Sequence, residues 1–514
     1  MQSIARHFRP ADGLILIAAF AVTALYTLAA GGNFPLDDSW IHQTYGRNLA
    51  HTGQWAFVSG VPSAASTSPL YTVVLAIGYA LNLPFRLWTH GIGALSLGLT
   101  GMIGMRLAER LAPDVRRIGV VTGLALVLAW HLIWAAASGM ETAIFAMLTL
   151  LLILLAWREL DARSEATQLV LLRGAVFGAV AALLTLTRPE GVLLVGMIGV
   201  ALVIVRPGMT WRTIILWGGA ALALFALLLA PYLIFNYQIT GGLLPNTAAA
   251  KRVYSMPLLD QPYLWRIGNV VLPLLAGGQI LLIPGIVAFT VVMFRRLRRE
   301  RVALLLLLPL LWGVGLILLY AAWLPLNFQH SRYLMPALPS LIIAGVVGTA
   351  WIIRRMQATM LARVVSSVLA LSAVGLFLVF AFAEGLRAYV QDVTIIDQEM
   401  VATAHWLSGN VPPDELLAVH DIGAVGYFAP RPILDIAGLV TPEIVPILHD
   451  PAAMWSFIAE RDARYLMVLD NQIPGESSNR PALCLAFTTG GETAVSAGGS
   501  NMTIYGLAWD GECS

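Results

Sequence analysis

The apolar stretch LILIAAFAVTALYTLAA (residues 14–30) is followed almost at once by Leu36-Asp37-Asp38-Ser39-Trp40-Ile41-His42. As a helix, the first run has the length that crosses a hydrocarbon layer, which takes roughly 20 residues. The two adjacent carboxylates then lie where the bilayer gives way to water, and like charges side by side resist being ionised together. The stretch therefore predicts a membrane helix with a carboxylate pair beyond its end, and this pair is a candidate for proton transfer.

Similar apolar runs recur along the 514 residues, of which 58% are hydrophobic and 12% charged. That charged share is about half that of a soluble globular chain, so we expect a polytopic α-helical membrane protein. A net charge of +2 gives no indication of a nucleic-acid partner. We expect about eleven crossings, over residues 14–30, 88–107, 118–136, 141–157, 174–187, 191–205, 213–235, 270–294, 302–323, 334–353 and 363–383.

The placement of Lys and Arg tests this threading, because cytoplasmic loops are rich in both. With the N-terminus inside, most of the 31 basic residues fall in inside segments, as in the run 295–301. To keep this bias we place 70–83 as an interfacial helix and 174–205 as two short helices that meet at an outer turn. The first run is longer than the apolar core of a signal peptide, so we expect it to be retained.

Residues 396–514 lack long apolar runs, and an odd number of crossings puts them outside. They predict a small extracytoplasmic α/β domain with helices at 397–408 and 454–461 and strands at 416–420, 431–436, 465–470 and 501–509. Its two cysteines, Cys484 and Cys513, pair in an oxidising compartment or remain two unrelated thiols.

The unusual polar side chains fall on the outer side of this threading. They are Asp37, Asp38, His42, Tyr45, Glu141, Arg188, Glu190, Asn246, Lys251, His330 and Arg332. Polar residues beside a membrane are costly and often functional. Two donors on one short turn, as in His330 and Arg332, suit an anion.

Each of these residues also has a structural interpretation. The aspartate pair could cap a helix over 39–50. Arg188 and Glu190 could simply pair with each other at a helix–helix turn. The remaining structural readings place Glu141 in the first turn of its helix, Arg332 against lipid headgroups, and Trp130, Trp134, Tyr320 and Trp323 in an interfacial aromatic belt.

Four short motifs occur in order, all on the outer side. They are 36–42 continued by Ser66-Thr67-Ser68-Pro69-Leu70-Tyr71, then Ser138-Gly139-Met140-Glu141-Thr142, Thr187-Arg188-Pro189-Glu190-Gly191, and His330-Ser331-Arg332-Tyr333-Leu334-Met335-Pro336. Together they resemble the GT-C membrane glycosyltransferases, especially the bacterial arabinofuranosyltransferases and the protein-mannosyltransferase and aminoarabinose-transferase relatives. The resemblance covers a transmembrane domain over 1–385 with a catalytic first outer loop at 31–87, while the tail 396–514 is typical only in position.

The resemblance implies transfer of a sugar from a polyprenyl-phosphate donor to a glycan, lipid or protein acceptor on the outer face of a bacterial cell membrane, usually with inversion. It implies that Asp37, with Asp38 beside it, is the base, and that the donor phosphate binds Arg332, His330, Arg188 and Lys251. We expect further substrate contacts from His42, Tyr45, Glu141, Glu190 and Asn246. A second acidic residue that some relatives carry in the loop after position 70 has no clear counterpart.

The chemistry fits this interpretation. A carboxylate that accepts the proton of a sugar hydroxyl contributes ~10²–10⁴-fold, and Arg or His donors offset the charge on the departing phosphate. No nucleotide-binding glycine motif and no Cys/His metal cluster appears, so no cofactor is required, although a divalent metal could bridge the aspartates and the phosphate. The alternatives are a transporter or flippase for a lipid-linked or small anionic substrate, which usually shows repeats and midplane charges, and a non-catalytic scaffold.

Overall fold

The computed structural model describes residues 9–162, 166–206, 209–243, 245–356 and 359–513. Within them, seven helices are long and apolar enough to cross a membrane, or eight if the bent pair α5 (Ile118–Val127) and α6 (Trp130–Ala137) forms one span. The seven spans contain α1 (Pro10–Ala29), α4 (Phe85–Leu111), α8 (Thr167–Thr187), α10 (Trp211–Thr240), α14 (Ile283–Leu297) with η2 (Gly278–Leu282), α18 (Leu338–Arg355) with α17 (Phe328–Ser331) and η3 (Arg332–Ala337), and α19 (Met360–Val379).

Every predicted crossing coincides with an apolar helix. Three of the crossings are shorter than the rest, namely α7 (Thr142–Arg158), α9 (Gly191–Val205) and α16 (Leu308–Trp323). The total of about eleven is reached only when these count as spans, so that number remains a prediction. The break between α8 and α9 is confirmed, and so is a separate short helix, α3 (Pro69–Ala80), after the first loop.

The remaining elements of this part are short and lie beside the spans. They are α2 (Asp37–Thr52), β1 (Ala56–Val58), β2 (Val61–Pro62), α11 (Asn246–Tyr254), α12 (Met256–Leu259), α13 (Tyr263–Val271), η1 (Leu272–Leu275) and α15 (Ala303–Leu306). Asp37 and Asp38 are the first two residues of α2, which therefore begins two residues before the helix expected at 39–50.

Small residues let the membrane helices approach closely. On α8, a Cβ added to Gly174 would lie 2.2 Å from the carbonyl oxygen of Trp217 on α10, and one added to Gly178 would lie 2.1 Å from that of Ala221. Without a hydrophobic driving force between helices in lipid, such close packing holds them together. The other faces of α10 are apolar and exposed, with Ile215 at 68% and Leu222 at 66%, as lipid contact requires.

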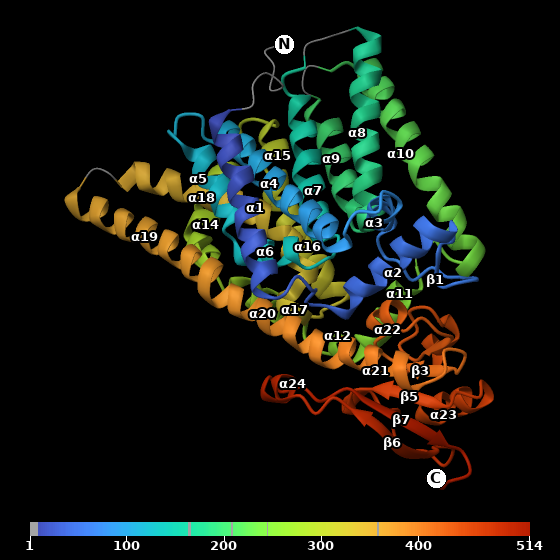
Figure 1. Ribbon diagram of the computed structural model, residues 1–514. Helices are drawn as coiled ribbons and strands as arrows, with labels where there is room; N and C mark the ends of the chain where they lie inside the picture. The colour runs from blue at the N-terminus through green and yellow to red at the C-terminus, as the bar shows by residue number, and fades with distance from the viewer. Residues whose placement is uncertain (1–8, 163–165, 207–208, 244, 357–358, 514) are drawn as a thin grey trace.

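The arginine-rich ends of the helices lie at the end of the molecule opposite the C-terminal domain (Figure 1). There, ion pairs join Arg106 to Asp12 at 2.7 Å, Arg110 to Asp161 at 2.7 Å and Arg173 to Glu159 at 3.3 Å. The arginine-rich segments that the sequence groups on one side of the membrane thus also lie at one end of the structure.

The C-terminal domain contains a five-stranded sheet in the order β4-β3-β5-β7-β6. Its elements are β3 (Leu417–Val419), α22 (Gly423–Phe428), β4 (Ile433–Asp435), η7 (Pro442–Ile447), α23 (Pro451–Glu460), β5 (Tyr465–Val468), η8 (Asp470–Gln472), β6 (Ala482–Thr488), α24 (Glu492–Ser496) and β7 (Thr503–Ala508). Strand β3 pairs in parallel with β4 and β5, while β7 pairs antiparallel with β5 and β6. The sequence predicted all of the strands except β6, and a disulfide joins Cys484 to Cys513.

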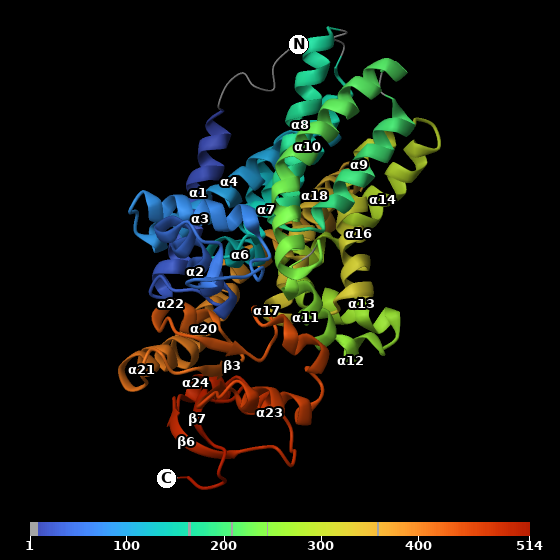
Figure 2. The same ribbon diagram turned by 90° about the vertical axis from the view of Figure 1, so that its right-hand side faces the viewer.

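The helix predicted at 397–408 is not a separate element. Helix α19 continues through η5 (Phe380–Glu384), α20 (Gly385–Ile396), η6 (Asp397–Val401) and α21 (Ala402–Asn410), so one helical rod leads from the membrane into the sheet domain (Figure 1). Figure 2 shows α20 and α21 beside the sheet domain. Residues 384–396 contain no proline and are helical throughout, so nothing in them separates the membrane helix from the helix expected at 397–408.

The C-terminal domain and the first outer loop share one hydrophobic core. Trp40 and Phe57 from the loop lie in the same buried cluster as Val419, Val425 and Ile504 from the domain. A second cluster, around Trp455 and Leu466, belongs to the domain alone. The domain therefore packs directly on the loop that carries the aspartates.

We expect Gly178→Ala to lower the thermal stability of the detergent-solubilised protein, because the new methyl group would push α8 away from α10. Overpacking of this kind costs about 1–3 kcal/mol. The matched control is Gly219→Ala on α10, where an added Cβ meets nothing within 4 Å and helix propensity alone rises. Equal melting temperatures for the two variants would contradict the close crossing.

Candidate active site

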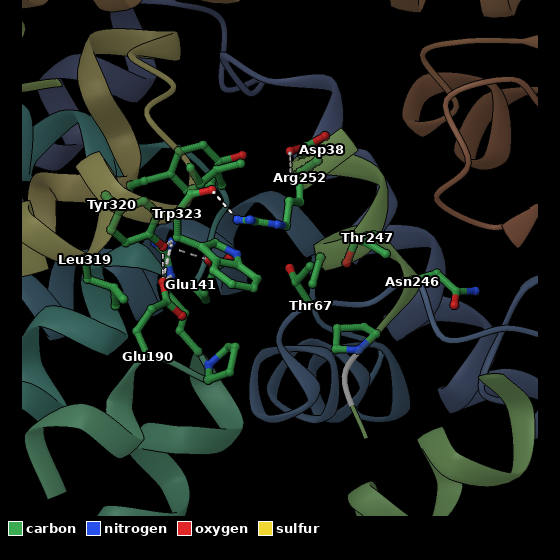
Figure 3. Close-up of a pocket in the computed structure, with 18 of the residues that line it drawn as sticks. Asp38, Thr67, Glu141, Glu190, Asn246, Thr247, Arg252, Leu319, Tyr320 and Trp323 are labelled. Atoms are coloured by element: carbon green, nitrogen blue, oxygen red, sulfur yellow. Dashed lines mark hydrogen bonds and ion pairs between the residues drawn. The ribbon is translucent and has the colours of Figure 1, made fainter. Parts of the chain in front are cut away.

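A cavity of about 720 Å³ lies where α2, α11, α16 and the turns before α7, α9 and α18 converge. Its lining contains four cationic and three anionic side chains, which are Arg188, Lys251, Arg252, Arg332, Asp38, Glu141 and Glu190. In Figure 3, Glu141, Glu190 and Tyr320 lie along one wall, and Asp38, Thr67 and Thr247 lie across from them. The rest of the lining is largely apolar, including Leu243, Leu319 and Leu324.

Asp38 lies between two cations. Its Oδ2 accepts from Arg332 Nη2 at 2.5 Å and from Lys251 Nζ at 3.4 Å. Burial alone would raise the pKa of Asp38, but the charges of Lys251 and Arg332 outweigh it and hold the pKa well below its ordinary value. Asp38 is therefore ionised, and as long as both cations contact it, it is a weak base.

Arg332 is buried, with 6% of its surface exposed. Its Nη2 donates to Asp38 and, at 3.2 Å, to the hydroxyl of Tyr333. Nε and Nη1 have no hydrogen-bond partner among the described residues. A buried N–H without a partner is costly unless a ligand satisfies it. Arg332 therefore has unused donors and lies in the wall of the cavity.

Arg188 differs from Arg332 in that carboxylates balance its charge. Glu190 Oε1 lies 3.0 Å from its Nη2, and Glu141 Oε1 lies 3.9 Å from its Nη1. The same Nη2 donates to the hydroxyl of Tyr320 at 2.6 Å, and that hydroxyl in turn donates to Glu190. The pairing of Arg188 with Glu190 is thus confirmed, and Arg188 shapes the wall of the cavity with its charge already balanced.

The two adjacent aspartates point in different directions. Asp37 is absent from the cavity lining, and its carboxylate accepts the backbone N–H groups of Gly423 at 2.6 Å and Ala424 at 2.8 Å. The expectation that the pair caps the helix over 39–50 is therefore wrong, because both aspartates lie inside α2 and Asp37 instead accepts from the first turn of α22 in the C-terminal domain. Because only Asp38 reaches the cavity, the geometry favours Asp38 for substrate contact, the reverse of the order expected from the sequence.

Burial, helped by the nearby negative charge of Asp421, raises the pKa of Asp37 to about 7. The two N–H donors of α22 act in the opposite direction, because they stabilise the carboxylate. Asp37 is thus a buried acid that titrates near neutrality at the contact between the first loop and the C-terminal domain.

The other predicted site residues divide into two groups. Asn246 lines the cavity, and His42 lies just behind it with Nε2 3.5 Å from Glu141 Oε2. His330 and Tyr45 are not among the lining residues. His330 Nε2 contacts Asp392 at 2.9 Å, and the hydroxyl of Tyr45 contacts Ser63 Oγ at 2.5 Å within the loop core.

Aromatic side chains line the cavity where the sequence suggested a lipid belt. Tyr320 and Trp323 belong to the lining, together with Tyr333, whose ring the guanidinium of Arg188 overlies at 5.4 Å. Trp130 and Trp134 are buried between helices, and Trp134 donates to Asp392. The belt interpretation was therefore wrong for both tryptophans, because spacing along a helix does not show which face is covered by a neighbour.

The donor set around Asp38 does not suit a divalent metal. Magnesium and calcium need several oxygen ligands, whereas the groups that contact Asp38 are the cations Lys251 and Arg332. The part of the chain that the structure describes has no group of three or more His, Cys, Asp or Glu placed to hold a metal. Asp37 faces away, so a metal bridging the aspartate pair does not fit either.

Replacing Asp37 by Asn tests the buried acid. A raised pKa means that the stability contributed by protonated Asp37 is present below its ordinary pKa and is lost as the pH rises through about 7. We expect the melting temperature of the parent to fall relative to that of Asp37→Asn between about pH 4 and pH 7. Exposed Asp414→Asn is the control, and a pH-independent difference for Asp37→Asn would contradict the burial.

Comparisons with known proteins give a fold and one domain. Residues 384–505 match the model of a domain of unknown function (DUF8728). A search of curated protein sequences finds no match.

The solved structures similar to this chain are membrane glycosyltransferases. ArnT from Cupriavidus metallidurans bound to undecaprenyl phosphate aligns with a TM-score of 0.59 and 13% identity, over 96% of this chain and 98% of that one. The Archaeoglobus fulgidus oligosaccharyltransferase tethered with an acceptor peptide gives 0.59 and 12%, over 89% and 69%. The arabinofuranosyltransferase AftD from Mycobacteria gives 0.50 and 16%, over 96% and 40%. The chain therefore has the GT-C fold of these polytopic membrane enzymes.

Proposed function

We propose that the protein is a glycosyltransferase that moves a sugar from a polyprenyl-phosphate donor to an acceptor on the outer face of the membrane. The observation that carries this proposal is buried Arg332, which lines the cavity, pairs with ionised Asp38 and leaves Nε and Nη1 without a partner among the described residues. A structure with the same fold is bound to undecaprenyl phosphate, which supports a lipid-linked donor. The acceptor is a glycan, lipid or protein.

Arg332 and Lys251 would bind the donor phosphate. Both already contact Asp38, and two nitrogens of Arg332 have no partner among the described residues. The largely apolar lining keeps water away and makes each charge contact stronger than it would be in solvent. Two side-chain cations would offset the charge of the leaving phosphate, so we propose that no metal or other cofactor is required.

Asp38 would act as the base, and donor binding would activate it. When the phosphate draws Arg332 and Lys251 toward itself, the carboxylate loses the contacts that hold its pKa low, and its proton affinity rises. Asp38 can then accept the proton of the acceptor hydroxyl as that oxygen bonds to the anomeric carbon. The bond from the anomeric carbon to the phosphate oxygen breaks with its electron pair, which gives polyprenyl phosphate and, after a single displacement, an inverted linkage.

Glu141, Glu190 and Asn246 would contact the sugar or the acceptor, since all three line the cavity. The hydrogen bond from Tyr320 to Glu190 and the ion pair with Arg188 hold Glu190 in one position. His42 would act on the substrate through Glu141, because it lies behind that carboxylate.

An outward-facing site in a cell membrane agrees with two features of the chain. The arginine-rich ends lie opposite the C-terminal domain, which favours a cytoplasmic N-terminus. The disulfide between Cys484 and Cys513 suits an oxidising compartment. A transporter would place such charges near the bilayer midplane within a repeat architecture.

We expect Asp38→Asn to lower kcat for sugar transfer by ~10²–10⁴-fold, because the amide cannot accept the proton of the acceptor. Release of polyprenyl phosphate from a polyprenyl-phosphate sugar by reconstituted protein measures the rate. Asp414→Asn, on the surface of the C-terminal domain, is the control. Unchanged turnover in Asp38→Asn would remove Asp38 as base, and a parent that never turns over such donors would favour transport.

We expect Arg332→Gln to raise the KM for the donor by about tenfold or more, since a charge-assisted hydrogen bond to phosphate contributes about 1.5–3 kcal/mol. The matched control is Arg252→Gln, because Arg252 lines the same cavity but donates to the carbonyl of Trp323 and stacks on that ring at 3.8 Å. If both variants raise the KM equally, the phosphate contact is not specific to Arg332.

A further inference from the structure

Two helices within the domain of unknown function, residues 384–505, contact the segments that carry Asp38 and Arg332. Both contacts involve residues that are absent from the cavity lining, so they reach the site from behind. Helix α22 contacts the start of α2, and helix α20 contacts the turn before η3.

Helix α22 is held at both ends by charged side chains of α2. At its start, Gly423 and Ala424 donate to the carboxylate of Asp37. At its end, the guanidinium of Arg47 donates to the carbonyl oxygens of Tyr427 at 2.8 Å and Gly426 at 3.0 Å. An acceptor at the start of a helix and a cation at its end satisfy backbone N–H and C=O groups that have no partner within the helix.

The contact between α22 and α2 leaves no room for side chains. A Cβ added to Gly423 would lie 2.0 Å from the carbonyl oxygen of Asp37, and one added to Gly426 would lie 2.2 Å from the ring of Phe57. The backbone of α22 therefore rests on the first turn of α2, one residue before Asp38. A displacement of α22 would displace that turn.

Helix α20 holds the other side of the site. Its Asp392 accepts from Trp134 Nε1 at 2.8 Å and contacts His330 Nε2 at 2.9 Å. His330 is the middle of three consecutive residues with left-handed backbone, since Gln329, His330 and Ser331 have φ of 41°, 60° and 58°. L-residues adopt this conformation rarely and only where the surroundings hold it, and Arg332 is the next residue.

We propose that the C-terminal domain is the positioning half of the active site, with α22 fixing Asp38 through Asp37 and α20 fixing Arg332 through His330 and Asp392. The two members of the ion pair are 294 residues apart in sequence, and one domain braces both of them. This role rests on the proposed transfer reaction. Asp37, His330 and Asp392 are positioning residues, because they act through Asp38 and Arg332 rather than on the substrate.

The proposal predicts a different kinetic defect for each contact. Asp392→Ala loosens the turn before Arg332, so the KM for the donor should rise about 10- to 100-fold with a smaller change in kcat. Gly423→Ala pushes α22 off α2 and misplaces Asp38, so kcat should fall by a similar factor with the donor KM nearly unchanged. Gly409→Ala, in the same domain where an added Cβ meets nothing within 4 Å, is the matched control.

A double-mutant cycle tests whether Asp392 acts through His330. The effects of Asp392→Ala and His330→Ala should not add, so the double variant should be no worse than the poorer single variant. Additive losses, or equal effects on KM and kcat from the α20 and α22 variants, would overturn the proposal, because a merely destabilised domain predicts both.

Hydrogen exchange in the full-length protein separates this inference from the proposed reaction. Amides of 326–335 should exchange faster in Asp392→Ala, and those of 36–44 faster in Gly423→Ala, with the parent rate in Gly409→Ala. A parent that does not turn over lipid-linked sugars sinks the proposed function, while the exchange rates still decide whether the domain holds these segments. Unchanged exchange, or faster exchange with unchanged kinetics in an active parent, overturns the positioning role.

Discussion

The ion pair between Asp38 and Arg332 is the interaction on which the site depends. It joins the first outer loop, at Asp38, to the turn before α18, at Arg332. Two parts of the cavity wall that lie 294 residues apart in the sequence are thereby connected. Buried charges are costly unless they are paired and fully hydrogen-bonded. This pair is incompletely satisfied, because two nitrogens of Arg332, Nε and Nη1, have no partner among the described residues. An anion would complete it, which links the stability of the site to ligand binding.

Arg188 and Asp37, two other buried ionisable groups at the site, already have their partners. Arg188 is surrounded by Glu141, Glu190 and Tyr320, so its charge is neutralised inside the wall. Asp37 is satisfied by backbone N–H groups of the C-terminal domain instead of by a cation. Arg332 differs from these two groups, because it lines the cavity and two of its buried nitrogens have no partner among the described residues. That arrangement gives a phosphate one preferred position.

The C-terminal domain lies against the segments that carry Asp38 and Arg332. Its sheet shares a buried core with the first loop, and its helix α22 contacts Asp37, next to Asp38. Helix α20, which leads into the domain, contacts the side chain of His330, two residues before Arg332. A long helical rod from α19 to α21 connects the membrane to this domain without a loop. Motion between the two parts would therefore change the distance between Asp38 and Arg332. The domain and the membrane part are best regarded as two sides of one site.

The sequence alone determined the membrane class, the apolar helices, the break at Arg188–Glu190 and most strands of the C-terminal domain, because hydropathy and charge bias are properties of local segments. Seven of the site residues predicted from their shared position on the outer side do line one cavity. They are Asp38, Glu141, Arg188, Glu190, Asn246, Lys251 and Arg332. Only the tertiary structure decided that Asp37 turns away, that His330 and Tyr45 do not line the cavity, and that Tyr320 and Trp323 do. Adjacent residues on a helix point in directions about 100° apart, and which of those directions meets a ligand depends on helices hundreds of residues distant.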